Sequence, residues 1–526
     1  MSTLQPVLID GRWRAADASA SFTAFNPATG EALDESYPTS AWTDCEAALA
    51  AAARAFEALR QLPASTVAAF LRRYAERIEA RAAELCATAH AETGYPLKPR
   101  LADVELPRTT GQLRQAAAAA ESEVWTQPVI DLKLNIRSRL EPLGPVAVFG
   151  PNNFPFAFGS ASGGDFAAAV AAGCPVIAKA NSSHPGTTRL FAEEAAEAVR
   201  ECGLPAATVQ LLYRTSHADG ERLVADPRLG ASAYTGSRQA GLKLKAAADA
   251  AGKPIYLELS SVNPVVVLPG ALRERGEKIV DEFTASCLMG TGQFCTNPGL
   301  ILLVKGEATE RFIAAAAGKF AAAPVGTLLS RGVAESLARG VEVLRHAGAL
   351  EVTKSTSSAT AGFRHPNTLL LVSGRQFLAQ PHALQTECFG NTSLLVVADD
   401  LDELLAALDH LEGNLTGCIY SDTAGSDDDA SVRVAAKLRP RVGRLLNDKM
   451  PTGVAVSPAM NHGGPYPATG HPYFTAVGIP AAIGRFAMPA CYDGVREGRL
   501  PPSLRDKNPG GLWRNVDGVW TRNDCE

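Results

Sequence analysis

The first half of the chain alternates short apolar stretches with longer alanine-rich ones. Short, continuous apolar stretches are typical of strands that are buried on both faces. They occupy residues 145–150, 174–179, 208–213, 229–236 and 254–259. The stretches between them have helical spacing, at 160–172, 185–202, 216–225 and 237–250. Strands that alternate with helices predict a parallel sheet, and such sheets bind ligands beyond the carboxyl ends of their strands.

The rest of the chain extends this pattern. Apolar spacing predicts helices ahead of the first of these strands, at 44–60, 64–93 and 98–122. In the second half, buried strands are predicted at 264–268, 300–305, 394–398, 417–421 and 443–447. We therefore expect a second α/β domain after the first.

The stretch 131–141 has a different pattern. It alternates apolar and polar residues, with Leu132, Leu134 and Ile136 on one face, which predicts one half-exposed antiparallel strand outside the buried sheets. A strand of this kind needs a partner, and another subunit is a candidate. Asp-Gly pairs at 10–11 and 517–518 predict hairpins near the two ends of the chain.

Composition and charge narrow the function classes. Of the 526 residues, 46% are hydrophobic and 20% are charged, which is ordinary for a soluble protein of two or three domains. A net charge of −5 does not favour a nucleic-acid or membrane partner, and the first residues do not resemble a signal peptide. Ten scattered cysteines without a Cys-x-x-Cys pair indicate reduced thiols in a cytoplasmic protein. The nine histidines lack paired ligand spacing, so we expect no metal.

One cysteine has unusual neighbours. Cys295 lies in the stretch MGTGQFCTNPG, among glycines and small polar residues, whereas a core cysteine usually has large apolar neighbours. A thiolate is a strong nucleophile for a carbonyl carbon, and a glycine-rich backbone lets another molecule come close. Such chemistry needs a hydrogen-bond donor to the oxyanion, a base that activates water for hydrolysis, and an acceptor for the group that leaves the carbonyl carbon.

Candidates for the first two roles lie at the ends of predicted strands. Asn153 follows a strand in GPNNFPF, and its amide suits an oxyanion donor; the alternative is a turn asparagine ahead of a proline. Glu258 ends the strand of YLELSS, where a partly desolvated carboxylate suits a base. The alternative for Glu258 is a buried acid paired with an arginine or a helix N-terminus. Glu387, in TECFGN, is a second acid of this kind.

Two further turns suit a phosphate or a ribose. In YTGSRQAG, Gly236 leads into a predicted helix that contains Gly241, and a glycine turn at a helix N-terminus can hold a pyrophosphate. The spacing is not that of the GxGxxG fingerprint, so this signal is weak alone. Lys179 ends the strand of VIAK and suits a ribose or phosphate contact, with a solvated surface lysine as the alternative.

Taken in chain order, these stretches resemble the aldehyde dehydrogenase superfamily over nearly the whole chain. PNNFP is similar to the family's P-W-N-F-P, with Asn152 in place of tryptophan, and KANS is similar to its K-P-x-E. YTGS, ELSS and GQFC are similar to F-T-G-S, E-L-G-G and G-Q-x-C. ECFGN is similar to E-x-F-G-P, with Asn391 where proline is usual. The resemblance implies that Cys295 attacks an aldehyde and that Asn153 stabilises the oxyanion. Glu258 would then activate water to release the acid.

The resemblance also implies a nicotinamide cofactor, NADP or NAD. The residues that would bind it are Lys179, Ser182, Gly236, Ser237, Gly241, Glu387 and Phe389. NAD-specific members of the superfamily carry an acid three residues after the strand-end lysine, where it repels a 2′-phosphate. This chain has Ser182 at that position and no acid between Lys179 and His184, which favours NADP.

The fold that the resemblance implies is an α/β aldehyde dehydrogenase fold. It would have a Rossmann-type cofactor-binding domain at 1–126 and 142–258 and an α/β catalytic domain at 259–456. A β-arm for oligomerisation and a C-terminal tail would take up 127–141 and 457–526. We expect a homodimer or homotetramer that acts on a small-molecule aldehyde, without a nucleic-acid or membrane partner.

Finer stretches resemble the branch of α-ketoglutaric semialdehyde dehydrogenases, among them ELSSVNPVVVLP, NHGGPYPAT and RFAMPACYD. The resemblance implies NAD(P)+-dependent oxidation of α-ketoglutaric semialdehyde (2,5-dioxopentanoate) to 2-oxoglutarate. That branch also holds NADP-linked fatty aldehyde dehydrogenases, so the alternative is oxidation of a medium- or long-chain aldehyde. A substrate with a carboxylate is bound best by an arginine or lysine in the tunnel, whereas a fatty chain is bound best by an apolar tunnel wall. A non-catalytic protein on the same scaffold and a cofactor-free thioesterase are alternatives from other classes. The intact Cys, Glu and Asn set argues against the first, and Lys179 with the YTGS turn argues against the second.

Overall fold

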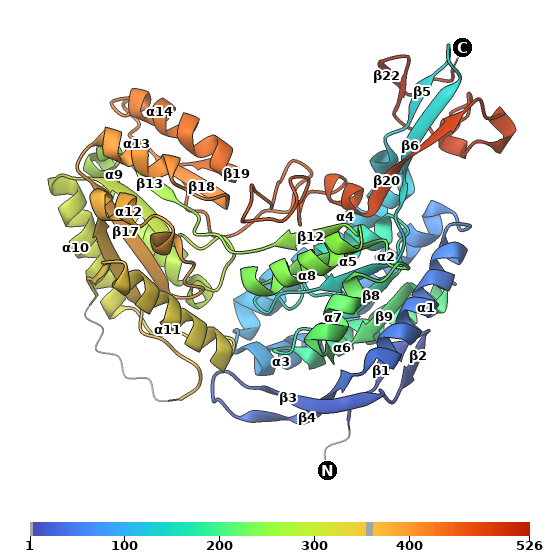
Figure 1. Ribbon diagram of the computed structural model, residues 1–526, viewed down its shortest axis with the longest axis horizontal. Helices are drawn as coiled ribbons and strands as arrows, with labels where there is room; N and C mark the ends of the chain where they lie inside the picture. Colours follow the sequence, from blue (N-terminus) through green and yellow to red (C-terminus); the bar gives the residue numbers. More distant parts are fainter. Residues whose placement is uncertain (1–3, 354–360, 526) are drawn as a thin grey trace.

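The computed structural model describes residues 4–353 and 361–525. Two seven-stranded sheets with their helices form two lobes, and a five-stranded sheet projects from the first lobe as an arm (Figure 1). A three-stranded sheet borders the first lobe, with strands β3 (Ala18–Phe25), β4 (Ala32–Ser40) and β10 (Arg214–Thr215). Within the described residues, no helix has the length and apolar character needed to cross a membrane.

The first sheet has the strand order β12-β11-β7-β8-β9-β1-β2. Its central strands are parallel and buried, as the short apolar stretches predict: β7 (Val146–Phe149), β8 (Val176–Lys179), β9 (Val209–Leu212), β11 (Ala231–Thr235) and β12 (Ile255–Glu258). At one edge lies the predicted Asp-Gly hairpin of β1 (Val7–Ile9) and β2 (Arg12–Arg14). Helices cover both faces, which explains why these strands lack a polar side.

The helices of this lobe follow the predicted pattern, except that one predicted helix is two helices in the structure. The predicted helix 64–93 is two helices, because the backbone at Arg81 leaves the helical region with φ −101° and ψ 14°. A π-helical turn, Leu97–Glu105, precedes α4. The helices are α1 (Trp42–Leu59), α2 (Ala64–Ala80), α3 (Ala82–Thr93), α4 (Leu106–Ser122), α5 (Gly164–Ala171), α6 (Pro185–Glu201), α7 (His217–Val224) and α8 (Arg238–Ala250).

The second sheet has the order β15-β16-β17-β14-β13-β18-β19, with apolar cores on both faces. Its strands are β13 (Val265–Val267), β14 (Leu300–Val304), β15 (Leu350–Glu351), β16 (Thr368–Ser373), β17 (Thr392–Ala398), β18 (Asn414–Tyr420) and β19 (Val442–Asn447). Its helices are α9 (Pro269–Leu288), α10 (Glu307–Ala322), α11 (Arg331–His346), α12 (Gly374–Ala379), α13 (Leu401–Asp409) and α14 (Asp428–Leu438). The sequence pattern missed β15 and β16.

The predicted single strand 131–141 is wrong. The segment is a hairpin of β5 (Val129–Asp131) and β6 (Ile136–Pro142), with a turn at 132–135. The Asp131 carboxylate accepts from the Leu134 backbone N–H at 2.8 Å, and Asn135 adopts a φ of +53°, which closes the turn. The apolar residue Leu134 therefore lies 61% exposed in the turn rather than on a strand face.

The arm strands find partners within their own chain. β6 pairs antiparallel with β5 on one side and with β20 (Ala487–Asp493) on the other. The predicted C-terminal hairpin of β21 (Arg514–Val516) and β22 (Val519–Thr521) forms and adds to β5, so the sheet has the order β20-β6-β5-β21-β22. Another subunit is thus not needed to pair β6, which removes the sequence-based reason for placing one there.

The segment 457–486, which precedes the last arm strands in the chain, packs on the first lobe. The predicted domain division groups residues 457–486 with the arm and tail. In the structure, Phe474, Val477 and Ile483 of this segment belong to the core of the first lobe. The first sheet draws its strands from 7–14 and 146–258, and the second from 265–447. The domain boundaries themselves stay a prediction.

The tail is organised by two buried arginines. The side chain of Arg514 is fully buried and donates to the backbone oxygens of Arg505, Asp506 and Asn523. Arg137 of β6 donates to the Leu504 oxygen at 2.5 Å and pairs with Asp506 at 2.7 Å. Such bonds join the last residues to the arm.

We predict that Arg514→Ala loosens the tail, because three backbone carbonyl groups lose their donor at once. Hydrogen exchange of the backbone amides in 505–525 should speed up by at least about tenfold, while the amides of β7 and β13 keep their rates. Arg522→Ala is the matched control, since Arg522 is exposed and donates to the Gly511 oxygen alone. Unchanged exchange in Arg514→Ala would contradict the assigned role.

Candidate active site

The register of the first sheet places the candidate residues at one edge. Phe149 lies opposite Lys179 and Tyr234, and Thr235 lies opposite Glu258. Because these strands are parallel, their carboxyl ends end at nearly the same level. The turns that follow them, which carry Asn153, Gly236 and the residues after Lys179, therefore border the same edge of the sheet.

The loop that carries Cys295 has a left-handed backbone. Gly290, Thr291 and Gly292 have φ values of +56°, +59° and +70°. A Cβ atom on Gly292 would lie 2.0 Å from the Gly390 oxygen, so only glycine fits at that position. The glycines near the cysteine thus allow two loops of the second lobe to pack together: the cysteine loop and the loop that contains Glu387.

Buried amides hold this loop in place. Asn263, in the link between β12 and β13, donates through Nδ2 to the oxygens of Cys295 and Asn297, each at 2.9 Å. Gln293 donates to the Gly290 and Thr327 oxygens at 3.1 Å each. The backbone of Cys295 is therefore fixed before any ligand arrives.

Asn153 lies against the same loop. Its Nδ2 donates to the Gln293 oxygen at 3.0 Å, and its side chain is buried. The amide carries a second N–H that this bond does not use. Asn153 therefore contacts the backbone two residues before Cys295 and keeps one amide N–H that this bond does not use. Its role as an oxyanion donor stays a prediction.

Glu258 does not pair with an arginine or a helix N-terminus among the described residues. Its Oε1 lies 3.1 Å from Nε2 of His462, and the same nitrogen lies 3.3 Å from Sγ of Cys295. Glu258 and His462 are buried, and Cys295 is half-buried. Nε2 of His462 thus faces both the thiol and the carboxylate. This nitrogen carries either one proton or one lone pair, so both neighbours interact with the same group.

The environment keeps the Cys295 thiol protonated. Burial raises the pKa of Cys295 well above its ordinary value, and the Glu258 carboxylate adds to the rise, while Arg108 opposes it. A nucleophilic sulfur therefore needs a nearby proton acceptor, and His462 is in place. All ten cysteines of the chain are free, as the sequence indicates.

The same atoms have a spacing that a metal ion can bridge. Ligand atoms of Glu258, Cys295 and His462 lie within 4.8 Å of one another. Hydrogen bonds between the sulfur, the imidazole and the carboxylate account for this closeness. The expectation of a metal-free enzyme stays a prediction.

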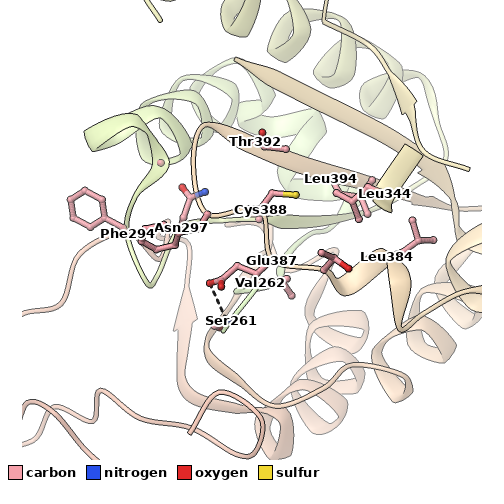
Figure 2. Close-up of a pocket in the computed structure, with 14 residues that line it drawn as sticks. Ser261, Val262, Phe294, Asn297, Leu344, Leu384, Glu387, Cys388, Thr392 and Leu394 are labelled. Carbon is pink, nitrogen blue, oxygen red and sulfur yellow. Dashed lines mark hydrogen bonds between the residues drawn. The ribbon is translucent and has the colours of Figure 1, made fainter. Parts of the chain in front are cut away.

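Glu387 lies on the other side of the loop, between the two lobes. Figure 2 shows its carboxylate beside Ser261, whose backbone N–H donates to it at 3.1 Å. Burial raises the pKa of Glu387 to about 7. A cavity of about 510 Å³ is lined by Glu387 together with Arg238, Ser260 and Glu412, residues that come from both lobes. Phe389 lines a smaller neighbouring pocket.

The glycine turn after β11 packs tightly and begins a helix. Ser237 caps α8, since its hydroxyl accepts from the Ala240 N–H. A Cβ atom on Gly236 would lie 2.7 Å from the Tyr234 hydroxyl, and one on Gly241 would lie 2.5 Å from Leu259. The N-terminal end of α8 opens beside the cavity through Arg238, which pairs with Glu412 at 2.9 Å. Amide donors, an arginine and a cavity of this size fit the pyrophosphate and ribose of a dinucleotide.

Lys179 and Ser182 do not line that cavity. Burial lowers the pKa of Lys179 to about 8, and the nearby Arg214 guanidinium adds to the fall. Lys179 ends β8 opposite Leu212, and Arg214 follows two residues later. The structure therefore adds Arg214, which the sequence did not single out, as a second cation that acts on Lys179.

Sequence reasoning also missed His462. The residue lies in the stretch NHGGPYPAT, far along the chain from the other catalytic candidates and without a ligand or triad spacing. The signal was the glycine pair that follows it: a Cβ atom on Gly443 would lie 1.7 Å from the Gly463 oxygen, so this turn packs backbone against backbone. A histidine beside such a turn is held firmly.

Comparisons with known proteins identify the family of the chain. The model of the aldehyde dehydrogenase family matches residues 13–464. The chain is 39% identical over 523 residues to alpha-ketoglutaric semialdehyde dehydrogenase 2 of Azospirillum brasilense, which covers 97% of this chain and 98% of that protein. It is 36% identical over 491 residues to alpha-ketoglutaric semialdehyde dehydrogenase of Acinetobacter baylyi, covering 91% and 92%.

Solved structures share the fold. Lactaldehyde dehydrogenase from Escherichia coli matches with a TM-score of 0.79 and 23% identity, covering 94% of this chain and 99% of that one. Aldehyde dehydrogenase C from Pseudomonas syringae, solved with NAD+ and octanal, matches with a TM-score of 0.78 and 20% identity, covering 94% and 98%. The family match over most of the length, together with the shared fold, shows that the chain belongs to the aldehyde dehydrogenase family and is an NAD(P)-dependent aldehyde dehydrogenase.

Proposed function

We propose that this chain oxidises 2,5-dioxopentanoate, which is α-ketoglutaric semialdehyde, to 2-oxoglutarate. The reaction type rests on one observation: a thiol, an imidazole and a carboxylate from three separate segments meet at hydrogen-bond distance. The choice of substrate is supported by the relatives from Azospirillum brasilense and Acinetobacter baylyi, which are named for it.

The first step is the attack of Cys295 on the aldehyde carbon. Its proton passes to His462, which shares it with the Glu258 carboxylate, and the sulfur adds to the carbonyl. The developing oxyanion accepts the second N–H of the Asn153 amide and the backbone N–H of Cys295. The bond from Asn153 to the Gln293 oxygen keeps the amide oriented during this step.

The second step releases the acid. When bound, the nicotinamide accepts the hydride that leaves the former aldehyde carbon. A thioester then remains on Cys295. The Oε2 atom of Glu258 is buried and has no hydrogen-bond partner among the described residues, so it can accept a proton from water. The resulting hydroxide adds to the thioester carbon, and the sulfur leaves and takes back the proton that His462 holds. Glu258 then releases the proton of the water to the solvent.

The cofactor that we propose is NADP+, with NAD+ also accepted. Support comes from Lys179 and Arg214, two cations close enough for one to depress the pKa of the other. A 2′-phosphate between them relieves this repulsion, and the Ser182 hydroxyl lies near the end of the same strand. In the cavity between the lobes, Glu387 suits the nicotinamide ribose.

We also propose that the arm joins subunits of a homodimer or homotetramer. β20 and β22 are the two edge strands of the arm sheet and present unpaired backbone groups on their outer sides. Val519 and Trp520 on β22 are 65% and 54% exposed. An exposed apolar edge of this kind favours contact with another protein chain.

Two other functions remain to be tested against this one. A fatty aldehyde dehydrogenase would oxidise long aldehydes best, and a non-catalytic scaffold would form no reduced nicotinamide at all. A panel of aldehydes, with and without a carboxylate, assayed with both nicotinamides separates the three. The proposal predicts the highest kcat/KM for 2,5-dioxopentanoate.

The nucleophile is tested by Cys295→Ala. Without a sulfur no thioester forms, so we predict that formation of reduced nicotinamide falls by at least about a thousandfold while cofactor still binds. Cys491→Ala, which removes an exposed thiol on the arm, is the control and should keep full activity. Substantial residual activity in Cys295→Ala would sink the thioester mechanism.

The base is tested by Glu258→Gln. The amide keeps an oxygen that can face His462 but cannot take a proton from water. We predict a rapid burst of about one reduced nicotinamide per subunit, followed by a steady state at least about a hundredfold slower than in the wild type. Glu197→Gln, on the surface of α6, serves as the control. If burst and steady state fell together, Glu258 would have a different role.

Cofactor choice is tested by Ser182→Glu. A carboxylate at this position repels a 2′-phosphate, so we predict a shift toward NAD+ of about 1–3 kcal/mol. The measurement is the ratio of kcat/KM for the two cofactors in both proteins. Ser183→Glu adds the same charge one residue later and shows how far the effect depends on position. A wild type with strong NAD+ preference, or an unmoved ratio, would place Ser182 away from the ribose.

A further inference from the structure

We propose that Arg108 binds the carboxylate of the aldehyde substrate and so makes the enzyme selective for short aldehydes that carry an acid group. This inference rests on the proposed function and names the residue that recognises the substrate. It follows from where Arg108 lies, which of its donors are used, and which acids surround it.

Arg108 lies close to the reaction centre. It lies in the first turn of α4, directly after Pro107. Its guanidinium lies 5.2 Å from the ring centroid of Phe158, and that ring lies 5.7 Å from the imidazole of His462. His462 in turn contacts the sulfur of Cys295. One aromatic ring thus separates the guanidinium from the catalytic imidazole.

The donors of Arg108 are only partly used. Nη1 donates to the Val454 oxygen at 2.7 Å. Nε and Nη2 are buried and have no hydrogen-bond partner in the described part of the chain. Buried donors nearly always have partners, and those of a charged group most of all. Nε and Nη2 lie on one edge of the planar guanidinium, which is the edge that grips a carboxylate through two parallel bonds.

The protein supplies no acid to this edge. Glu105, at the end of the π-helical turn just before α4, pairs instead with Arg100 at 2.9 Å and also accepts from the Phe156 and Ala157 N–H groups. Arg100 spends a further donor on the Asn153 oxygen at 3.0 Å. Among the described residues, Arg108 forms no ion pair, whereas both terminal nitrogens of its neighbour Arg100 have partners and only its Nε lacks one.

The charges around Arg108 also suit an incoming anion. Burial lowers the pKa of Arg108, and the positive charge of Arg100 adds to the fall. Glu105, Cys295 and Glu258 have the opposite effect. A substrate carboxylate at the free edge therefore compensates a charge that the protein leaves partly unbalanced. The rings of Phe154 and Phe158, which lie within 5.9 Å and 5.2 Å, support the flat face of the guanidinium.

This arrangement does not suit a fatty aldehyde. An alkyl chain has no acceptor for Nε and Nη2, so its binding would cover two charged donors without satisfying them. The free edge therefore favours a carboxylate-bearing substrate over the long-chain alternative, on evidence that is independent of the names of the relatives.

The test compares Arg108→Gln and Arg108→Met with the wild type, using 2,5-dioxopentanoate and uncharged pentanal. Gln keeps a donor for the Val454 oxygen but has no charge, so it separates carboxylate binding from support of that loop. We expect kcat/KM for 2,5-dioxopentanoate to fall at least a hundredfold in both variants, mainly through KM. We expect kcat/KM for pentanal to stay within threefold of the wild type or to rise.

A second readout does not require turnover. The product 2-oxoglutarate should slow the alkylation of Cys295 by iodoacetamide in the wild type but not in Arg108→Gln, whereas 2-oxopentane should slow it in neither. Equal losses for both aldehydes, or product protection that survives in Arg108→Gln, would overturn the proposal. Arg189→Gln, which alters an arginine paired with Glu35 and Glu193, is the control.

The outcomes also separate this inference from the proposed function. If the wild type prefers another acid-bearing aldehyde, such as succinic semialdehyde, and Arg108→Gln loses that activity, the substrate assignment fails and the role of Arg108 stands. If the wild type oxidises pentanal as well as it oxidises any acid-bearing aldehyde, both fail. If 2,5-dioxopentanoate is preferred but Arg108→Gln leaves its KM unchanged, only the role of Arg108 fails.

Discussion

The active site depends on a buried contact between His462 and two partners of opposite character. One imidazole nitrogen lies 3.3 Å from the Cys295 sulfur and 3.1 Å from a Glu258 oxygen. The three groups come from a loop of the second lobe, the end of a strand of the first, and a segment that packs back onto the first core. Burial raises the pKa of the thiol, so in the mechanism that we propose this neighbour takes the proton of the sulfur. Much of the surrounding structure fixes these three groups: the left-handed turn at Gly292, the Asn263 clamp and the amide of Asn153.

The two arginines near this contact have different surroundings. Arg100 and Glu105 form a closed pair that holds the backbone near Asn153, whereas Arg108 keeps one edge of its guanidinium free. The guanidinium of Arg108 lies near the rings of Phe154 and Phe158, and the charge of Glu258 acts on it. In our proposal, the same cluster combines the thiol of Cys295, which loses a proton, with the guanidinium of Arg108, which binds an anion. This pairing suits an aldehyde that carries an acid group at its far end.

Much of the fold could be predicted from the sequence, because buried parallel strands have a strong signature. The strands β7, β8, β9, β11 and β12 follow from apolar runs, and the stretch around Cys295 stands out by its glycines. The arm could not be predicted in this way: Leu132 and Leu134 alternate like a strand, but the Asp131 carboxylate and the positive φ of Asn135 turn the chain there. His462 and Arg108 were missed because their roles arise from contacts between distant segments, which no local pattern reports. Their roles become visible only once donors, acceptors and burial are known together.

The central claim is that an acyl group resides on Cys295 during turnover. Rapid acid quenching of the enzyme within its first turnover with 2,5-dioxopentanoate and NADP+, followed by peptide mass spectrometry, measures this directly. The account predicts one 2-oxoglutaryl group per subunit, carried by the peptide that contains Cys295 and no other cysteine. A quenched enzyme that has formed reduced nicotinamide but carries no acyl group, or carries it on another cysteine, would contradict the account.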